Sequence, residues 1–202
     1  MNIALTTFND SNYNSLYNIT GPTKQKYCEK WGLSYEYVQT RPGNHFWEKP
    51  RIFLEMLQKY DAVIYIECDA AIMNQDFDVR PYIEEHEFIV TTDLNGINCG
   101  TYIARSTDLV KQFFYAVNTT GLHFFRNHQW GDQEACRYFL ASPPYDKLAT
   151  YMPQNFMCSN LNSVYGYPAY IKGDYRPGDW IVHLSGISLQ QRCSIFKTML
   201  EV

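Results

Sequence analysis

The segment Ile64-Tyr65-Ile66-Glu67-Cys68-Asp69-Ala70 decides which fold and which chemistry we expect of this chain. Its first half ends a strongly apolar strand, expected over residues 61–66, of the kind found in the buried centre of a parallel sheet. Because residues i and i+2 of an extended chain point the same way, Glu67 and Asp69 are expected to face one ligand. Two hard oxygen ligands suit Mg²⁺ or Mn²⁺, whereas the alternative is a solvated turn at the strand end.

Strands and helices are expected to alternate on both sides of this segment. Further strands are expected over residues 3–8, 33–38, 88–92, 99–104 and 180–184, and loops over 39–47 and most of 142–177. One helix is expected to end near Trp31 before Gly32, another to hold Pro50 in its first turn, a third to be capped by Ser106, and a last to begin at Ser188. The alternation predicts one α/β domain over residues 1–202, with a Rossmann-like, mixed and mostly parallel sheet flanked by helices.

Composition and charge exclude several classes of function. The net charge is −4 and Lys and Arg form no run, which argues against nucleic acid and anionic membranes as partners. No apolar stretch approaches the ~20 residues of a transmembrane segment, and the first residues lack the pattern of a signal peptide, so we expect a soluble, cytoplasmic protein. Six cysteines without a C-x-x-C pair argue against a zinc knuckle, and Cys68 and Cys99 are expected to be buried.

Three later segments accompany the acidic triplet. They are Gly96-Ile97-Asn98-Cys99-Gly100-Thr101-Tyr102-Ile103-Ala104-Arg105, Trp130-Gly131-Asp132-Gln133-Glu134 and Trp180-Ile181-Val182-His183-Leu184-Ser185-Gly186. In order and spacing, these blocks resemble GT-A fold glycosyltransferases, and in particular the galactosyl- and xylosyltransferase family that includes yeast Golgi α-galactosyltransferases and plant xyloglucan xylosyltransferases. The resemblance covers roughly residues 47 to 186. Glu67 stands where this family usually has Asp, and Leu184 where it has Phe.

The resemblance implies a metal-dependent glycosyltransferase. Such an enzyme moves a sugar from a nucleoside-diphosphate sugar, with a UDP-sugar favoured, to a hydroxyl of a carbohydrate acceptor, and the family resemblance implies retention of configuration. Asp69 is expected to bind the metal directly, and Glu67 to bind the metal or the donor ribose. His183 is expected to be a third ligand, which favours Mn²⁺ over Ca²⁺. The alternative for His183 is a core histidine whose ring is satisfied by backbone groups.

The remaining motif residues are assigned to the sugars. Asp132 and Gln133 are expected to be catalytic residues beside the transferred sugar, although an aspartate there is also favoured at a helix N-terminus. Asn98 and Gly100 are expected to hold the donor or acceptor sugar, because an amide both donates and accepts and a glycine permits close approach of a ring. A strand bulge or turn is the alternative for this pair.

Four further residues are assigned to the donor. Lys49 precedes a helix as in the family and is expected to meet the donor phosphate, with a solvated lysine as the alternative. Thr6, Thr7 and Tyr13 lie at the first strand or just after it, where such folds bind the base and ribose.

Other classes of function remain open from the sequence. A sugar-nucleotide nucleotidyltransferase would need a Gly-rich, basic loop after the first strand, and residues 8–12 supply neither Gly nor Lys. A non-catalytic nucleotide-sugar or carbohydrate binding domain would bind a donor without turnover. A metal-dependent hydrolase usually has more His and Asp ligands than this chain clusters. An inverting enzyme would need a carboxylate base, for which Asp132 or Asp93 is available.

Overall fold

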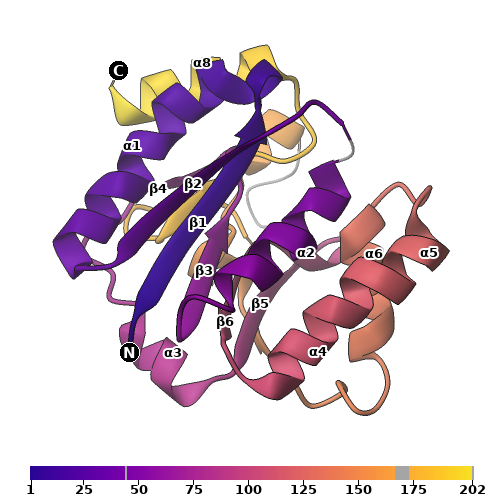
Figure 1. The fold of residues 1–202 in the computed structure, drawn as a ribbon. Helices are drawn as coiled ribbons and strands as arrows, with labels where there is room; N and C mark the ends of the chain where they lie inside the picture. The colour runs from indigo at the N-terminus through magenta and orange to yellow at the C-terminus, as the bar shows by residue number, and fades with distance from the viewer. Residues whose placement is uncertain (44, 167–172, 202) are drawn as a thin grey trace.

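The computed structural model describes residues 1–43, 45–166 and 173–201, and its centre is a six-stranded sheet in the order β2-β1-β3-β6-β5-β7 (Figure 1). The strands are β1 (Ile3–Asp10), β2 (Ser34–Thr40), β3 (Ala62–Ile66), β5 (Phe88–Asp93), β6 (Gly96–Arg105) and β7 (Ala149–Met152). The β1 strand pairs parallel with β2 and β3, and β5 pairs parallel with β7, whereas β6 is antiparallel to β3 and β5. The mixed, mostly parallel α/β sheet confirms the predicted fold class.

Helices cover both faces of this sheet. They are α1 (Asn14–Trp31), α2 (His45–Met56), α3 (Arg80–Glu85), α4 (Asp108–Ala116), α5 (Leu122–Phe125), α6 (Gly131–Leu140), α7 (Gln154–Met157) and α8 (Leu189–Leu200). Short helical turns are Ser11–Tyr13, Val117–Gly121 and Asn162–Tyr165. In the part of the chain that the structure describes, no helix combines the length and the apolar character needed to cross a bilayer.

The side chains of β3 alternate between two hydrophobic cores. Val63 and Tyr65 belong to the core formed with α2, α4 and α6, while Ala62, Ile64 and Ile66 belong to the core formed with α1 and α3. Figure 1 shows the first group of helices on one side of the sheet and α1 and α8 on the other. Because both faces are buried, β3 is apolar throughout its length, as its sequence predicts.

A second, two-stranded sheet carries the C-terminal part of the chain to the end of β3. It pairs β4 (Ala70–Ile72) antiparallel with β8 (Ile181–His183), with Ala70 opposite His183. Leu184 continues the ladder by donating its backbone N–H to the carbonyl of Asp69 at 3.0 Å. This register places residue 183 beside the acidic triplet, although 114 positions separate it from Asp69 in the sequence (183 − 69).

Three boundaries differ from the predictions. The α2 helix begins at His45, so Pro50 lies inside the helix, where it costs a single backbone hydrogen bond, and most of the loop expected before it is strand or helix. The α4 helix is capped by Thr107, whose Oγ1 accepts from Val110 N, because Ser106 instead donates its hydroxyl to the carbonyl of Leu57.

The third difference concerns the long loop expected over residues 142–177. It contains β7 and α7, and β7 forms the edge of the main sheet through parallel pairing with β5. A four-residue edge strand has no hydrophobic alternation long enough to distinguish it from a loop. Residues 167–172 of this predicted loop, and residue 44 of the earlier one, lie outside the described residues.

Candidate active site

The acidic triplet forms a turn between β3 and β4, rather than the extended segment that the sequence predicts. Ala70 N donates to the carbonyl of Glu67 at 3.1 Å, which closes the turn, and Glu67 N donates to the carbonyl of Gly100 at 2.9 Å. Thr20 of α1 donates its hydroxyl to the carbonyl of Cys68 at 2.7 Å. The backbone of the turn is therefore fixed on both sides, by β6 and by α1.

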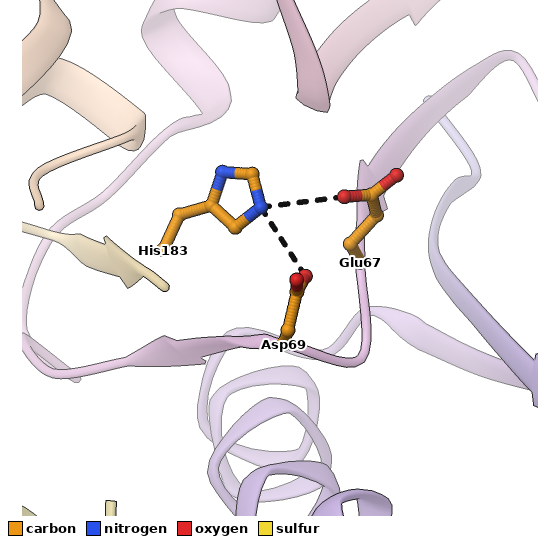
Figure 2. Close-up of side chains that lie close together, drawn as sticks. All are labelled: Glu67, Asp69 and His183. Carbon is orange, nitrogen blue, oxygen red and sulfur yellow. Dashed lines mark ion pairs between the residues drawn. The ribbon is translucent and has the colours of Figure 1, made fainter. Parts of the chain in front are cut away.

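Both carboxylates of this turn approach the imidazole of His183 (Figure 2). His183 Nε2 lies 3.3 Å from Glu67 Oε2 and 3.2 Å from Asp69 Oδ1, and one ligand atom from each residue lies within 4.8 Å of the others. Asp69 and His183 are 8% and 3% exposed. We call Glu67, Asp69 and His183 the acidic-turn cluster.

The polar atoms of the acidic-turn cluster fit a divalent cation. His183 Nε2 and Asp69 Oδ1 are buried, and among the described residues their polar contacts are those within the acidic-turn cluster. Adjacent ligands of an octahedral cation with bonds of about 2.1 Å lie about 3 Å apart, which is close to the nitrogen–oxygen separations observed here. The donor set of two carboxylates and one imidazole suits Mn²⁺ or Mg²⁺.

His183 is not a core histidine satisfied by the backbone. Its Nδ1 lies 3.3 Å from Cys158 Sγ, and its Nε2 faces the two carboxylates. Burial lowers the pKa of His183, but the negative charge of Asp69 and the contact with Cys158 raise that pKa further, so it lies well above its ordinary value. The same negative field would attract a metal cation.

Gly100 makes room for the imidazole of His183. A methyl group on Gly100 would overlap the His183 ring, so a larger residue at this position in β6 would displace the ring from the turn. The close approach that the sequence predicts at Gly100 is thus made by a protein side chain. Gly100 also lines a cavity beside the site, as does its neighbour Asn98.

Lys49 lies in α2 and contacts both the acidic turn and α6. It is 4% exposed, so it is not the solvated lysine of the alternative interpretation. Its Nζ lies 2.6 Å from Glu67 Oε1 and 3.3 Å from Asp132 Oδ2, and it donates to the carbonyl of Cys99 at 3.1 Å. A buried ammonium is stable here because two carboxylates and a carbonyl replace its water.

The pKa values of Lys49, Glu67 and Asp132 are shifted in different directions. Burial lowers the pKa of Lys49, but Asp132 and Glu67 together raise it above its ordinary value. Burial raises the pKa of Glu67, but Lys49 and His183 lower it further, to below its usual range. Burial raises the pKa of Asp132 to about 6, with Lys49 opposing this shift from a longer distance. At neutral pH the network therefore holds a charged pair of Lys49 and Glu67.

Asp132 and Gln133 lie in the first turn of α6, beside β6. The N-cap of α6 is Trp130, which makes no side-chain cap hydrogen bond, and Asp132 Oδ2 lies 3.3 Å from Lys49 Nζ. Asp132 Oδ1 is buried without a hydrogen-bond partner among the described residues. Gln133 Oε1 accepts from Cys99 N at 3.1 Å.

Asn98 is held in place by both ends of its amide. Its Oδ1 accepts from Gly100 N at 2.8 Å, and its Nδ2 donates to Asp93 Oδ2 at 2.7 Å. These bonds fix the amide at the cavity wall, beside the residues predicted to hold the sugar.

Two cavities meet at the acidic turn. The first, of about 400 Å³, is lined by Asn9, Asp10, Tyr13, Asp69 and Arg192 among others. The second, of about 340 Å³, is lined by Lys49, Asn98, Gly100, Asp132, Gln133 and His183 among others. We call them the first and the second cavity. Glu67, Phe46 and Gly186 line both, so the two spaces are neighbours across the turn.

Two predicted donor residues do not reach these cavities. Thr6 and Thr7 lie within β1, which continues to Asp10, and both are fully buried and line neither cavity. Tyr13 does line the first cavity, together with Asn9 and Asp10 from the end of β1. The β1 strand ends two residues later than the apolar run that predicted it. The sequence analysis therefore placed the residues that follow the strand too early in the chain.

Arg192 is a site residue that the sequence analysis misses. Its Nη2 lies 3.2 Å from Asp69 Oδ2, and its Nε donates to the carbonyl of Leu184 at 2.7 Å. Arg192 stands in the first turn of α8, whose start is fixed by a capping box between Ser188 and Gln191. The sequence signal that could have identified Arg192 is a positively charged residue shortly after His183 in a chain of net negative charge.

Cys68 and Cys99 are the two cysteines that the sequence predicts to be buried. Cys99 is buried, as predicted, whereas Cys68 is half-buried because it occupies the turn rather than the strand.

Comparison with known proteins finds similarity to glycosyltransferases in sequence and in fold. No family model matches the chain. An uncharacterized alpha-1,2-galactosyltransferase of Schizosaccharomyces pombe is 22% identical over 222 residues, covering 85% of this chain and 56% of that protein. The chain therefore spans little more than half the length of this curated relative.

Solved structures share the fold at lower sequence identity. A glycosyltransferase involved in the glycosylation of the major capsid of PBCV-1 has a TM-score of 0.75 and 12% identity, covering 98% of this chain and 100% of that one. The galactosyltransferase LgtC, in complex with donor and acceptor sugar analogs, has a TM-score of 0.63 and 8% identity, covering 96% and 95%. The chain has the GT-A glycosyltransferase fold, and the distant resemblance inferred from its motifs is confirmed.

Proposed function

We propose that this chain is a metal-dependent glycosyltransferase that moves a sugar from a nucleoside-diphosphate sugar to a hydroxyl of a carbohydrate acceptor. A UDP-sugar is the favoured donor and Mn²⁺ the favoured cation. The observation that carries the proposal is the acidic-turn cluster, in which two carboxylates and one imidazole converge between two neighbouring cavities. The curated relative and the structural neighbours, which are named as glycosyltransferases, support this function.

The first cavity would hold the nucleotide. Asn9, Asp10 and Tyr13 at the end of β1 offer hydrogen-bonding groups and an aromatic ring for a ribose and a base. At its other end this cavity reaches Asp69 and Arg192. A diphosphate there would lie beside the guanidinium of Arg192, which binds phosphate oxygens well because its donors form a rigid fork.

Asp69 and His183 would hold the cation directly, and Glu67 would complete the site from the opposite side of the turn. When bound, a divalent cation offsets the negative charge that develops on the departing diphosphate. Glu67 also binds Lys49 through its other oxygen, at 2.6 Å, so its orientation is fixed before any ligand binds. Preorganised charges of this kind stabilise a transition state without a cost of reorganisation.

The second cavity would hold the sugar that is transferred. Asp132 would accept hydrogen bonds from its hydroxyls, and Gln133 would lie near the anomeric carbon. The unpaired and buried Oδ1 of Asp132 supports this placement. In the transfer, the bond from the anomeric carbon to the diphosphate oxygen breaks and a bond to the acceptor oxygen forms. The hydroxyl proton of the acceptor passes to the released nucleoside diphosphate.

Calorimetry with UDP and GDP, in Mn²⁺ and in EDTA, tests the metal site. We expect affinity for the preferred nucleotide to fall at least tenfold in EDTA, because the diphosphate then meets Asp69 and Glu67 without a cation between them. Equal affinity in both conditions would contradict the metal site. A panel of nucleotide sugars then tests turnover, and tight binding of a donor without any turnover would favour a non-catalytic binding domain.

A further inference from the structure

His183 has two ring nitrogens, and the proposed metal site uses only one of them. Its Nε2 lies 3.3 Å from Glu67 Oε2 and 3.2 Å from Asp69 Oδ1. Its Nδ1 points away from both carboxylates, as Figure 2 shows. A neutral imidazole carries a single hydrogen, so Nδ1 must carry that hydrogen when the lone pair of Nε2 binds a cation. Because His183 is buried, the N–H of Nδ1 needs an acceptor within the protein.

The structure offers the thiol of Cys158 as this acceptor. Cys158 Sγ lies 3.3 Å from His183 Nδ1, and Cys158 is as deeply buried as the ring. The sulfur of a thiol accepts a hydrogen bond, although more weakly than a carboxylate or a carbonyl oxygen. The two ring nitrogens therefore have different neighbours, with the acidic turn at Nε2 and a thiol at Nδ1.

The backbone holds this thiol beside the ring. Cys158 is the C-cap of α7, and its N–H donates to the carbonyl of Gln154 at 2.9 Å. The next residue, Ser159, donates its N–H to the carbonyl of Ile181 at 3.0 Å and accepts from His183 N at 2.8 Å. The thiol and the imidazole thus belong to two backbone segments that are hydrogen-bonded to each other. Their contact is part of the fold rather than a chance approach of two long side chains.

The orientation of the ring decides whether a nitrogen faces the acidic turn. A Cβ atom on Gly100 would lie 2.1 Å from His183 Cε1, so β6 lies close to the ring edge that joins the two nitrogens. Turning the ring over about its bond to Cβ would bring Cδ2 to Cys158 and Cε1 to the carboxylates. A cation at the acidic turn would then lose its nitrogen ligand. A hydrogen bond from Nδ1 to Cys158 disfavours this second orientation, because it is lost when the ring turns over.

We propose that Cys158 is a positioning residue of the metal site, which accepts a hydrogen bond from His183 Nδ1 and so holds Nε2 toward the cation. This inference rests on the proposed function, since it concerns the same metal site. The outer partner of a metal-binding histidine is usually a carboxylate, a backbone carbonyl or water, and its loss lowers metal affinity about 10- to 100-fold. Because a thiol is a weak acceptor, we expect an effect at the lower end of this range.

Two variants of nearly equal size test the hydrogen bond. Cys158→Ala removes the acceptor, whereas Cys158→Ser supplies a hydroxyl oxygen near the position of the sulfur. We expect the affinity for Mn²⁺, measured by calorimetry without nucleotide, to fall about tenfold in Cys158→Ala and to stay close to wild type in Cys158→Ser. Cys28→Ala is the matched control and should leave the affinity unchanged. Cys28 is equally buried, but it lies in α1 and lines none of the cavities beside the acidic turn.

The proton on Nδ1 gives a second test, which a loss of packing alone would not reproduce. In protein loaded with Co²⁺, the ring N–H of a coordinated histidine gives a proton NMR signal that the paramagnetic ion shifts far outside the ordinary range. We expect one such signal, absent in D₂O and in His183→Ala. It should be sharp in the wild type and in Cys158→Ser, and broadened by exchange with water in Cys158→Ala. A signal equally sharp in all three proteins would overturn the hydrogen bond to Cys158.

Thermal unfolding of the metal-free proteins shows whether each variant is folded. If Cys158→Ala does not fold, Cys158→Val takes its place, because valine fills the space of the thiol without accepting a hydrogen bond. A charge-transfer absorption from sulfur to Co²⁺ that Cys158→Ser removes would make Cys158 a metal ligand, and would overturn its positioning role.

The outcomes separate the two proposals. A wild-type protein that binds neither Mn²⁺ nor Co²⁺ would overturn the metal site of the proposed function, and this inference with it. A wild-type protein that binds these ions, while folded Cys158→Ala binds them equally well, would overturn the role of Cys158 alone. Equal losses of affinity in folded Cys158→Ala and Cys158→Ser would also overturn it, because the serine hydroxyl can accept the hydrogen bond.

Discussion

The first and second cavities together form a cleft, and each of its two ends buries an aspartate in different surroundings. At the acidic-turn end, Asp69 Oδ1 lies 3.2 Å from His183 Nε2, and Asp69 Oδ2 lies 3.2 Å from Arg192 Nη2. At the α6 end, Asp132 meets the buried ammonium of Lys49 at 3.3 Å. At the α6 end the protein supplies the cation, Lys49, whereas at the acidic-turn end we propose that a metal ion supplies it.

Glu67 connects the two ends. One of its oxygens lies 2.6 Å from Lys49 Nζ and the other 3.3 Å from His183 Nε2, so a single carboxylate touches both the buried lysine and the acidic-turn cluster. This gives a physical reason for glutamate where the resembling family has aspartate, since the longer side chain spans the distance between the two groups. This difference is the basis for the proposed metal function at one end and the proposed sugar function at the other.

The largest expected effect is at the acidic-turn end. Asp69→Asn removes an anionic ligand while keeping the shape of the side chain, so we expect turnover to fall by about a thousandfold, or roughly 4 kcal/mol of transition-state stabilisation. Thermal unfolding without ligand should change little, because Asp69 lies in a turn and contributes no apolar packing. Asp146→Asn, the same change at an exposed position outside the cleft, is the control. Full turnover in Asp69→Asn would show that the acidic triplet is only a turn.

The next effect concerns stability at the α6 end. Lys49→Met removes the cation that Glu67 and Asp132 share, and leaves the buried carboxylate of Asp132 without its ion-pair partner. Breaking a buried ion pair in this way should lower the free energy of unfolding by about 3 kcal/mol, measured by urea denaturation. The double variant Lys49→Met, Asp132→Asn should recover part of this loss, because one unpaired charge is removed. A single variant as stable as the wild type would mean that the ion pairs are not formed in solution.

Local patterns were sufficient to predict most of the main sheet. The uninterrupted apolar run of β3 predicted a strand buried on both faces, and Ser188 predicted the start of α8. The short β7 was missed because its stability comes from pairing with β5, which is about 60 residues away in the sequence (149 − 88 = 61). The early start of α2 was missed because Pro50 indicates a first turn most strongly, yet a helix also accommodates it further in.

The sequence predicted the site residues that belong to motifs. It did not predict those whose role depends only on tertiary contacts. Glu67, Asp69 and His183 belong to motifs, and the structure brings them together. Arg192 belongs to no motif, and its role depends on the contact between α8 and the acidic turn. The reason for Gly100 also required the structure, because the ring that fills the space beside it comes from β8.

A smaller effect is expected from Gly100→Ala, which disturbs the acidic-turn end without removing a ligand. The added methyl group would displace the His183 ring, so we expect affinity for Mn²⁺ to fall about 10- to 100-fold, measured by calorimetry. If the loss acts through the imidazole, Gly100→Ala should cause no further loss in a protein that already carries His183→Ala. Equal and additive losses in the two single variants would place the effect of Gly100 elsewhere.

The smallest effect is expected from Asp132→Asn at the α6 end, and it tests the comparison most directly. The structure leaves Asp132 Oδ1 buried without a hydrogen-bond partner among the described residues, and its carboxylate does not cap α6. If this group binds the transferred sugar, kcat and kcat/KM should fall together by about tenfold, or about 1.4 kcal/mol, while affinity for the nucleoside diphosphate stays close to wild type. Asparagine keeps the shape of the side chain, and Lys49 keeps its closer partner Glu67, so folding should be preserved.

Gln133→Ala in the same turn should also slow transfer, because its amide lines the same cavity. A helix-terminus role would instead lower stability by about 1 kcal/mol with kcat unchanged. A loss of nucleotide affinity as large as the loss of kcat would assign Asp132 to the nucleotide, and the division of the cleft into a metal end and a sugar end would then be wrong.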